Sequence, residues 1–248
     1  YADAQRPILI NNWEATYFNF TAEKLLAIAK QAKTIGVDTF VLDDGWFLNR
    51  NGDSSSLGDW FVDEAKLGCP LSKLIDDINA LGMKFGLWFE PEMINPDSDL
   101  FRTHSEYVLG KMNKELTLQR HQLMLDYTNP EVVDCIFKQM CNILERYEID
   151  YVKWDHNRDM AEHISNFIPA ERQGEVYHRM VLGYYDLLEK ITTRYPNLMI
   201  EGCASGGGRF DLGILAYSPQ IWTSDNSDAI SRLGIQYSTS IFYPVCTM

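Results

Sequence analysis

Short, almost continuously apolar runs recur along the chain, and most of them end in polar or charged residues. Continuous rather than alternating hydrophobicity is typical of parallel strands that are covered on both faces. Strands are therefore expected at "PILINNW" (7–13), "TFVLDDGW" (39–46), "KFGLWFEPE" (84–92), "LMLDYTNP" (123–130), "YVKWDHN" (151–157), "LMIEGCASGG" (198–207), "IWTSDNSD" (221–228) and "IFYPV" (241–245).

Helical periodicity fills several of the gaps between these runs. Helices are expected within residues 21–36, 71–82, 129–147 and 175–195. In the first of them, Thr21 is the expected N-cap and Gly36 the stop. The apolar stripe of that helix is Leu25, Ile28, Ala32 and Ile35.

Strands that alternate with helices predict a parallel α/β architecture. Eight candidate strands in 248 residues fit a (β/α)8 (TIM) barrel best. An open, doubly wound sheet is the alternative. Because the N-terminus lacks a methionine and the C-terminus stops within an apolar segment, we expect residues 1–248 to be the barrel domain of a longer, multidomain protein. We expect this piece to lack the final helix of the barrel.

Seven of the expected strands carry polar or charged residues at their carboxyl ends, which is the active-site end of such a barrel. A single acidic residue after a strand is most often a helix cap. Seven strands with this feature predict instead a pocket rich in carboxylates. The acidic residues at these ends are Glu14, Asp43, Asp44, Glu90, Glu92, Asp126, Asp155, Glu201 and Asp225.

The pattern around Asp155 favours carboxylate chemistry over other kinds. The glycine run "CASGGGR" has no phosphate-loop lysine and is not a serine-hydrolase elbow. Binding of Mg²⁺ by the carboxylates is possible, but the charge of Lys153 competes with a cation. Lys153, Asp155 and Asn157 share one face of a strand, and a neighbouring lysine keeps an aspartate ionised, as a nucleophile requires.

Four tryptophans lie near the expected strand ends, and their flat faces suit the C–H faces of a pyranose. Packing in the core or at the rim is an equally good interpretation of each. Asp225 is a candidate for a second carboxyl group, held protonated by its acidic neighbours. Two carboxylates with aromatic platforms predict a glycoside hydrolase. The four tryptophans are Trp13, Trp46, Trp88 and Trp222.

An ordered series of motifs makes a resemblance specific. The segments "FVLDDGWF", "WFEPEM", "YVKWDHNR", "CASGGGR" and "IWTSDNSDA" resemble those of the glycoside hydrolase family 36 α-galactosidases, which are retaining (β/α)8 enzymes. The resemblance runs from about Trp13 to the C-terminus. It implies α-galactosidase activity on oligosaccharides of the melibiose and raffinose type, with no cofactor and no metal.

The resemblance also implies roles for individual residues. Asp155 corresponds to the nucleophile and Asp225 to the acid/base. The residues that it implies for substrate binding are Trp13, Asp43, Asp44, Trp88, Arg120, Lys153, Asn157, Cys203 and Gly206.

Several neighbouring polar residues have simpler interpretations. Asp228 is expected to cap the next helix. Glu90 and Glu92, separated by a proline, are expected to shape the rim of the pocket. Glu201 is a candidate for orienting Lys153 or Arg209. His156 faces away from Asp155 in an alternating strand and is expected to be structural.

The net charge of −13 and the pI of about 4.8 argue against nucleic acid and anionic membranes as partners. An odd set of five cysteines without a CxxC motif predicts reduced thiols and a cytoplasmic location. The resemblance implies a homo-oligomer in the full-length protein. Transfer of galactose, as in raffinose synthases, and an α-N-acetylgalactosaminidase remain alternatives. A metal-dependent barrel lyase and a non-catalytic sugar-binding module are alternatives of other classes.

Overall fold

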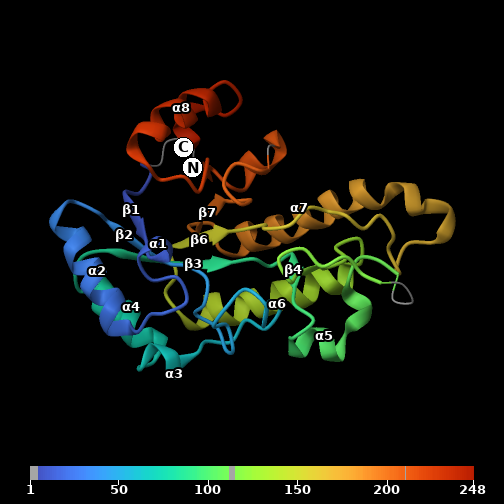
Figure 1. Ribbon diagram of the computed structural model, residues 1–248, viewed down its shortest axis with the longest axis horizontal. Coiled ribbons are helices and arrows are strands. Elements are labelled where there is room, and N and C mark those ends of the chain that lie inside the picture. The colour runs from blue at the N-terminus through green and yellow to red at the C-terminus, as the bar shows by residue number, and fades with distance from the viewer. Residues whose placement is uncertain (1–4, 112–114, 210) are drawn as a thin grey trace.

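A parallel sheet of six strands forms the centre of the computed structural model, which describes residues 5–111, 115–209 and 211–248 (Figure 1). The strands lie side by side in the order in which they occur along the chain, and every neighbouring pair is parallel. They are β1 (Leu9–Asn11), β2 (Thr39–Leu42), β3 (Lys84–Phe89), β6 (Tyr151–Trp154), β7 (Met199–Gly202) and β8 (Gln220–Ile221).

The sheet curls so that its last strand returns towards its first. Ser227, after β8, donates a hydrogen bond of 2.7 Å to Glu14, after β1. At the other end of the sheet, Arg6 donates one of 3.1 Å to the carbonyl oxygen of Cys246. Sequential parallel strands that curl in this way form the wall of a (β/α) barrel, which confirms the expected fold class. Within the described residues, β1 and β8 each pair with one strand, so the wall is open between them.

Two of the eight expected strands do not belong to this wall. The run 123–130 contributes only β5 (Leu123–Met124), which pairs antiparallel with β4 (Met93–Ile94) in a separate small sheet. Its side chains are buried, and burial alone makes a connecting segment as apolar as a strand. The run 241–245 is not a strand either. It forms a turn and enters a short 3-10 helix, and Ile241 is 70% exposed.

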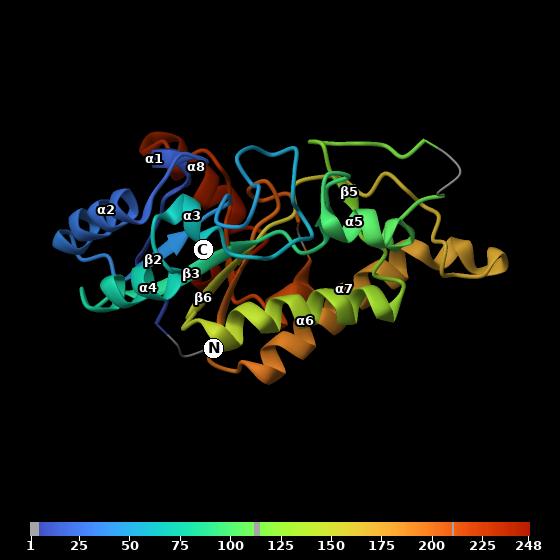
Figure 2. The same cartoon turned by 90° about the horizontal axis from the view of Figure 1, so that it is seen from below.

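The four expected helices are all present. They are α2 (Ala22–Thr34), α4 (Leu71–Asn79), α6 (Pro130–Arg146) and α7 (Val176–Arg194). The side chain of Thr21 caps α2 and Gly36 follows with φ of +92°, as expected. Ile35, however, is 80% exposed because it lies in the turn that ends the helix rather than on the buried stripe. Figure 2 shows α6 and α7 side by side against the outside of the sheet.

The remaining helices are α8, which follows β8, and several short α- and 3-10 helices. They are α1 (Trp13–Thr16), α3 (Glu64–Leu67), α5 (Asp99–Thr103), α8 (Ala229–Thr239), η1 (Ser105–Tyr107), η2 (Ala170–Glu175), η3 (Leu212–Ala216) and η4 (Val245–Thr247). No helix in the described ranges is long and apolar enough to cross a membrane.

An aromatic cluster supports the ends of β2 and β3. The rings of Trp46 and Trp60 stack with centroids 6.0 Å apart, and Phe89 meets Trp46 edge to face. The indole of Trp46 also donates a hydrogen bond of 2.8 Å to the carbonyl oxygen of Trp88. Trp46 is fully buried, so of the two interpretations of this tryptophan, packing in the core holds. Its close packing with Trp60 and Phe89 instead supports the carboxyl ends of β2 and β3.

Helix α7 lies unusually close to the segment that follows β5. A methyl group added at Gly183 would collide with the backbone carbonyl of Tyr127. The Tyr127 hydroxyl in turn donates a hydrogen bond of 2.6 Å to the carbonyl oxygen of Pro91, at the carboxyl end of β3. A helix on the outside of the sheet is therefore coupled through one tyrosine to the rim of the barrel.

We predict that Gly183→Ala destabilises the protein by about 1–3 kcal/mol or more, because α7 must move away from Tyr127. Gly234 in α8 is the matched control, since a methyl group there meets open space. Gly234→Ala should stabilise by up to about 1 kcal/mol. Urea unfolding of both variants measures the difference, and equal midpoints would contradict the close approach of α7.

Candidate functional site

The carboxyl ends of β3, β6, β7 and β8 place a row of polar side chains at one level of the barrel. The strand register aligns Trp88 with Lys153, Lys153 with Glu201, and Glu201 with Gln220. Asp155 follows two residues after Lys153, and the alternation of side chains in a strand carries it towards the same side.

Asp155 is held by several hydrogen-bond donors at the end of β6. One carboxylate oxygen accepts bonds from the Trp88 indole at 3.1 Å and from the Asn157 amide at 2.6 Å. The other accepts the backbone N–H of His156 at 2.9 Å. The residue is only 7% exposed. These contacts fix the orientation of its carboxyl group.

The charge state of Asp155 follows from its neighbours. Burial alone would raise its pKa, but the positive charge of Lys153 and hydrogen bonds from Cys203 and Asn157 outweigh burial and hold the pKa below the ordinary value. Asp155 is therefore ionised at neutral pH. A fixed, ionised carboxylate is what a nucleophile requires.

Lys153 also forms an ion pair with a second carboxylate, that of Asp43 after β2. Its ammonium group lies 2.8 Å from Asp43, whose second hydrogen bond comes from Asn11. Burial would lower the pKa of Lys153, but Asp43 and Asp155 raise it well above the ordinary value. The lysine therefore stays charged and links the ends of β2 and β6.

Asp44 forms a buried ion pair with Arg50. Its two oxygens accept bonds of 2.9 and 2.8 Å from Arg50, which is 1% exposed. Burial raises the pKa of Asp44 even though Arg50 opposes the shift. Arg50 was not among the residues expected at the site, and nothing in its local sequence distinguishes it from a surface arginine.

Glu92 and Arg209 form a buried ion pair beside the site. Nη2 of Arg209 lies 2.8 and 3.0 Å from the two oxygens of Glu92. Nδ1 of His156 lies 3.4 Å from one of the same oxygens. Burial opposes ionisation, but Arg209 and His156 lower the pKa of Glu92 to about 2. His156 thus turns away from Asp155 into a structural contact, as expected. The expectation that Glu201 orients Arg209 is wrong, because Glu92 does so.

Glu201 instead accepts a hydrogen bond of 2.5 Å from the hydroxyl of Tyr151. Burial raises the pKa of Glu201, although Lys153 acts in the opposite direction. Tyr151 was overlooked in the sequence. Its position two residues before Lys153 could have identified it, because strand alternation places both side chains on one face.

Asp225 lies on an exposed segment after β8. It accepts a hydrogen bond of 2.9 Å from the Trp222 indole. The segment rests on the glycine loop, where a methyl group at Gly206 would lie 3.0 Å from the backbone nitrogen of Asp225. Gly206 also has a φ of +84°, so the loop requires glycine there. Asp228 caps α8 through the N–H of Ser231, as expected.

A hollow of about 320 Å³ opens beside these residues, within the size range of small-molecule sites. Asp155 does not line it, but its partner Lys153 does. Trp13, half-buried and packed edge to face on Tyr17 and Phe18, forms part of the wall. Asp225, Trp222 and Glu201 also line this hollow.

A second hollow, of about 430 Å³, lies on the Asn157 side of the site. Arg120 and Ser205 line it together with Asn157. Ser205 donates a hydrogen bond of 2.8 Å to the Asn157 side-chain oxygen. Arg120 is exposed, in a tight turn with φ of +50°. Trp88, by contrast, is 1% exposed and reaches the site only through its indole N–H.

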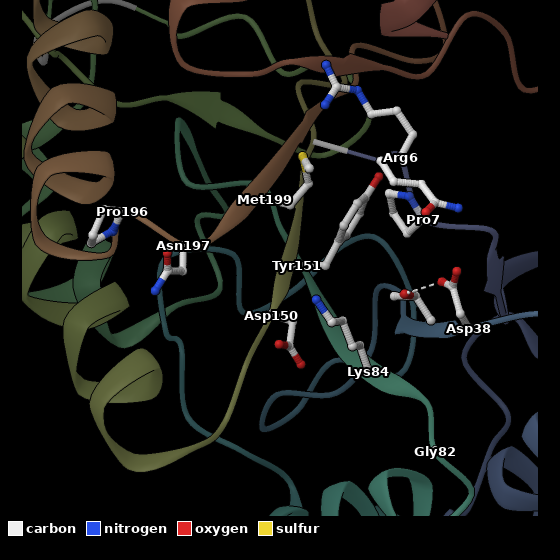
Figure 3. Close-up of a pocket in the computed structure, with 12 residues that line it drawn as sticks. Arg6, Pro7, Asp38, Gly82, Lys84, Asp150, Tyr151, Pro196, Asn197 and Met199 are labelled. Carbon is white, nitrogen blue, oxygen red and sulfur yellow. Dashed lines mark hydrogen bonds between the residues drawn. The ribbon is translucent and has the colours of Figure 1, made fainter. Parts of the chain in front are cut away.

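A larger pocket of about 610 Å³ lies at the opposite, amino end of the strands. Figure 3 shows Arg6, Lys84 and Asp150 around it, with Asp38 bonded to the hydroxyl of Thr39. Because the active sites of (β/α) barrels lie at the carboxyl ends of the strands, this pocket is not the candidate site. Across the ranges that the structure covers, no group of three or more His, Cys, Asp or Glu side chains is placed to hold a metal ion.

Comparison with known proteins identifies the family. The family model described as Melibiase matches residues 1–248. A bifunctional α-galactosidase/sucrose kinase of Mediterraneibacter gnavus is 52% identical over 248 residues, which cover all of this chain and 26% of that protein. An α-galactosidase of Lactobacillus acidophilus is 51% identical over all of this chain and 34% of its own length. The chain thus spans about a third or less of these relatives.

Solved structures agree with the sequence comparison. The family 36 α-galactosidase of Geobacillus stearothermophilus superposes with a TM-score of 0.95 at 51% identity, over 98% of this chain and 34% of that one. A variant of an α-galactosidase from that organism in complex with raffinose gives a TM-score of 0.96 at 50% identity, over 99% of this chain and 34% of that one. The chain therefore belongs to the melibiase family, the glycoside hydrolase family 36 α-galactosidases that its motifs resemble.

Proposed function

We propose that residues 1–248 are the catalytic barrel domain of a retaining α-galactosidase, which releases terminal α-linked galactose from oligosaccharides. The observation that carries the proposal is Asp155, a buried and ionised carboxylate held beside Lys153 and close to a sugar-sized hollow. The similar structures in complex with raffinose and with stachyose support oligosaccharides as substrates.

In the proposed mechanism, Asp225 protonates the glycosidic oxygen while Asp155 attacks the anomeric carbon. The bond to the leaving group breaks and a galactosyl ester of Asp155 forms. Asp225, now ionised, takes a proton from water, and the water oxygen displaces Asp155 to release galactose with its configuration retained. This mechanism requires the two carboxyl groups to be about 5–5.5 Å apart when substrate is bound.

The surrounding residues have separate proposed roles. Lys153 and Asp43, which form an ion pair, bind sugar hydroxyls, while Asp44 acts from its pair with Arg50. Asn157 holds both the nucleophile and the substrate. The remaining residues proposed to line the sugar site are Trp13, Trp88, Arg120, Cys203 and Gly206.

The full-length protein should hydrolyse p-nitrophenyl α-galactoside, and NMR should detect α-galactose as the first anomer released. Addition of EDTA should leave the rate unchanged. Release of the β-anomer would exclude the covalent mechanism, and loss of activity with EDTA would point to a metal-dependent enzyme. Absence of turnover would favour a sugar-binding module.

Asp155→Asn should lower kcat at least about a thousandfold, because the amide cannot form the ester intermediate. Circular dichroism should show an intact fold, since the amide oxygen can still accept the bonds of Trp88 and Asn157, which share one oxygen of Asp155. Substantial residual turnover by a pure preparation would reject Asp155 as the nucleophile.

Asp225→Ala should lower kcat/KM by about 10²–10⁴-fold on substrates with poor leaving groups, which need a proton from the acid. Substrates with activated leaving groups should lose far less. Asp228→Ala is the matched control, because Asp228 only caps α8. Equal losses on both kinds of substrate would show that Asp225 is not the acid.

We further propose a cytoplasmic location, supported by five free cysteines, and a homo-oligomer. Cell fractionation tests the location. Light scattering of the full-length protein tests the oligomer, and a monomeric mass would contradict it.

A further inference from the structure

Glu90 is a fully buried carboxyl group at the end of β3 that the proposed mechanism does not use. One of its oxygens accepts the backbone N–H of Asn157 at 2.6 Å. The other accepts the side-chain amide of Gln122 at 3.1 Å. Glu90 thus connects β3 to the segment that follows the proposed nucleophile.

The side chain of Asn157 extends this connection to Asp155. Its amide nitrogen donates a hydrogen bond of 2.6 Å to Asp155, and its oxygen accepts one of 2.8 Å from Ser205. Because Glu90 holds the backbone of Asn157, it determines where that side chain can place its donor. A shift of Asn157 would move one of the bonds that orient the nucleophile.

The charges around Glu90 favour its protonated form. Asp155, after β6, and Asp44, after β2, both act on it, and the only cation among its strongest electrostatic partners is Arg50. Arg50 already makes two bonds to Asp44. Arg50 therefore acts on both Asp44 and Glu90, whereas Lys153 pairs with Asp43 and acts on Asp155. Like-charged carboxyl groups in one site cannot all ionise easily.

We propose that Glu90 is a positioning residue that, in its neutral form, fixes Asn157 and through it the nucleophile Asp155. This inference rests on the proposed function of Asp155. Burial, followed by the charges of Asp155 and Asp44, raises the pKa of Glu90 to about 8, so the neutral form predominates at neutral pH. Above that pH, ionised Glu90 adds a negative charge beside Asp155.

The pH dependence of activity tests this role in the full-length protein. The Asp225→Ala background with 2,4-dinitrophenyl α-galactoside removes the acid, whose own ionisation would otherwise limit activity at alkaline pH. In this background kcat/KM should fall with an apparent pKa near 8. Adding Glu90→Gln, which is neutral at every pH, should remove this fall or move it upward by about one pH unit or more.

Glu90→Ala separates positioning from charge. It should lower kcat/KM by about 10- to 100-fold at every pH, because the backbone N–H of Asn157 loses the side chain that accepts its hydrogen bond. Glu90→Gln keeps an acceptor there and should restore much of that loss. The matched control is Asp126→Asn, since burial also raises the pKa of Asp126 while its side chain bonds Ser165 and Thr128 rather than Asn157. This control should leave the alkaline fall in place.

The stability of the same proteins gives an independent measurement. The folded-state pKa of Glu90 lies above its unfolded value of about 4.5, so its contribution to stability is present below that pH and is lost as pH rises towards 8. The Tm of Glu90→Gln relative to the parent should therefore increase across this range.

If Glu90→Gln leaves the fall of kcat/KM at alkaline pH unchanged, the proposal is wrong. Equal kcat/KM of Glu90→Ala and Glu90→Gln would also overturn it. A double-mutant cycle with Asn157→Ala should show strong non-additivity, and simple additivity would also contradict the proposed route. If the parent protein processes no α-galactoside at all, the proposed function itself is wrong.

Discussion

The positive charge of Lys153 between Asp43 and Asp155 is the interaction on which the site depends. Burial disfavours the charged form of Asp155, and the charge of Lys153 is the largest effect that opposes burial. Lys153 acts on carboxylates that follow two different strands, Asp43 after β2 and Asp155 after β6. Its register beside Trp88 and Glu201 fixes its position along the barrel axis. The sheet geometry and the charge state of Asp155 are therefore parts of one arrangement.

The same balance between burial and nearby charges sets the pKa of the other buried carboxyl groups, with a different outcome for each. Asp44 has Arg50 and Glu92 has Arg209, whereas Glu90 has no ion pair of its own in the part of the chain that the structure describes. Two glutamates separated by one proline thus take opposite charge states: Glu92 has a pKa of about 2 and Glu90 one of about 8. For these two glutamates, the presence of Arg209 and His156 beside Glu92 and of acidic neighbours beside Glu90 decides the charge state.

The sequence predicted most of this arrangement where periodicity and spacing carry the information. The order of the parallel strands, the four main helices, the caps at Thr21 and Asp228 and the Lys153–Asp155 pair follow from local patterns. The run 123–130 does not, because a buried connecting segment is as hydrophobic as a strand. Arg50 and the burial of Trp46 and Trp88 depend on contacts between distant segments, which no local pattern records.

The close approach of α7 to Tyr127 has a consequence for engineering this chain. Replacing helical glycines with alanine is a common way to raise thermal stability. At Gly183 that replacement would push on Tyr127, whose hydroxyl holds the carbonyl of Pro91 between Glu90 and Glu92. The missing side chain of Gly183 thus leaves the space that α7 needs to approach the rim of the candidate site, so stabilising libraries should leave Gly183 unchanged and vary a helical glycine such as Gly234, which faces open space.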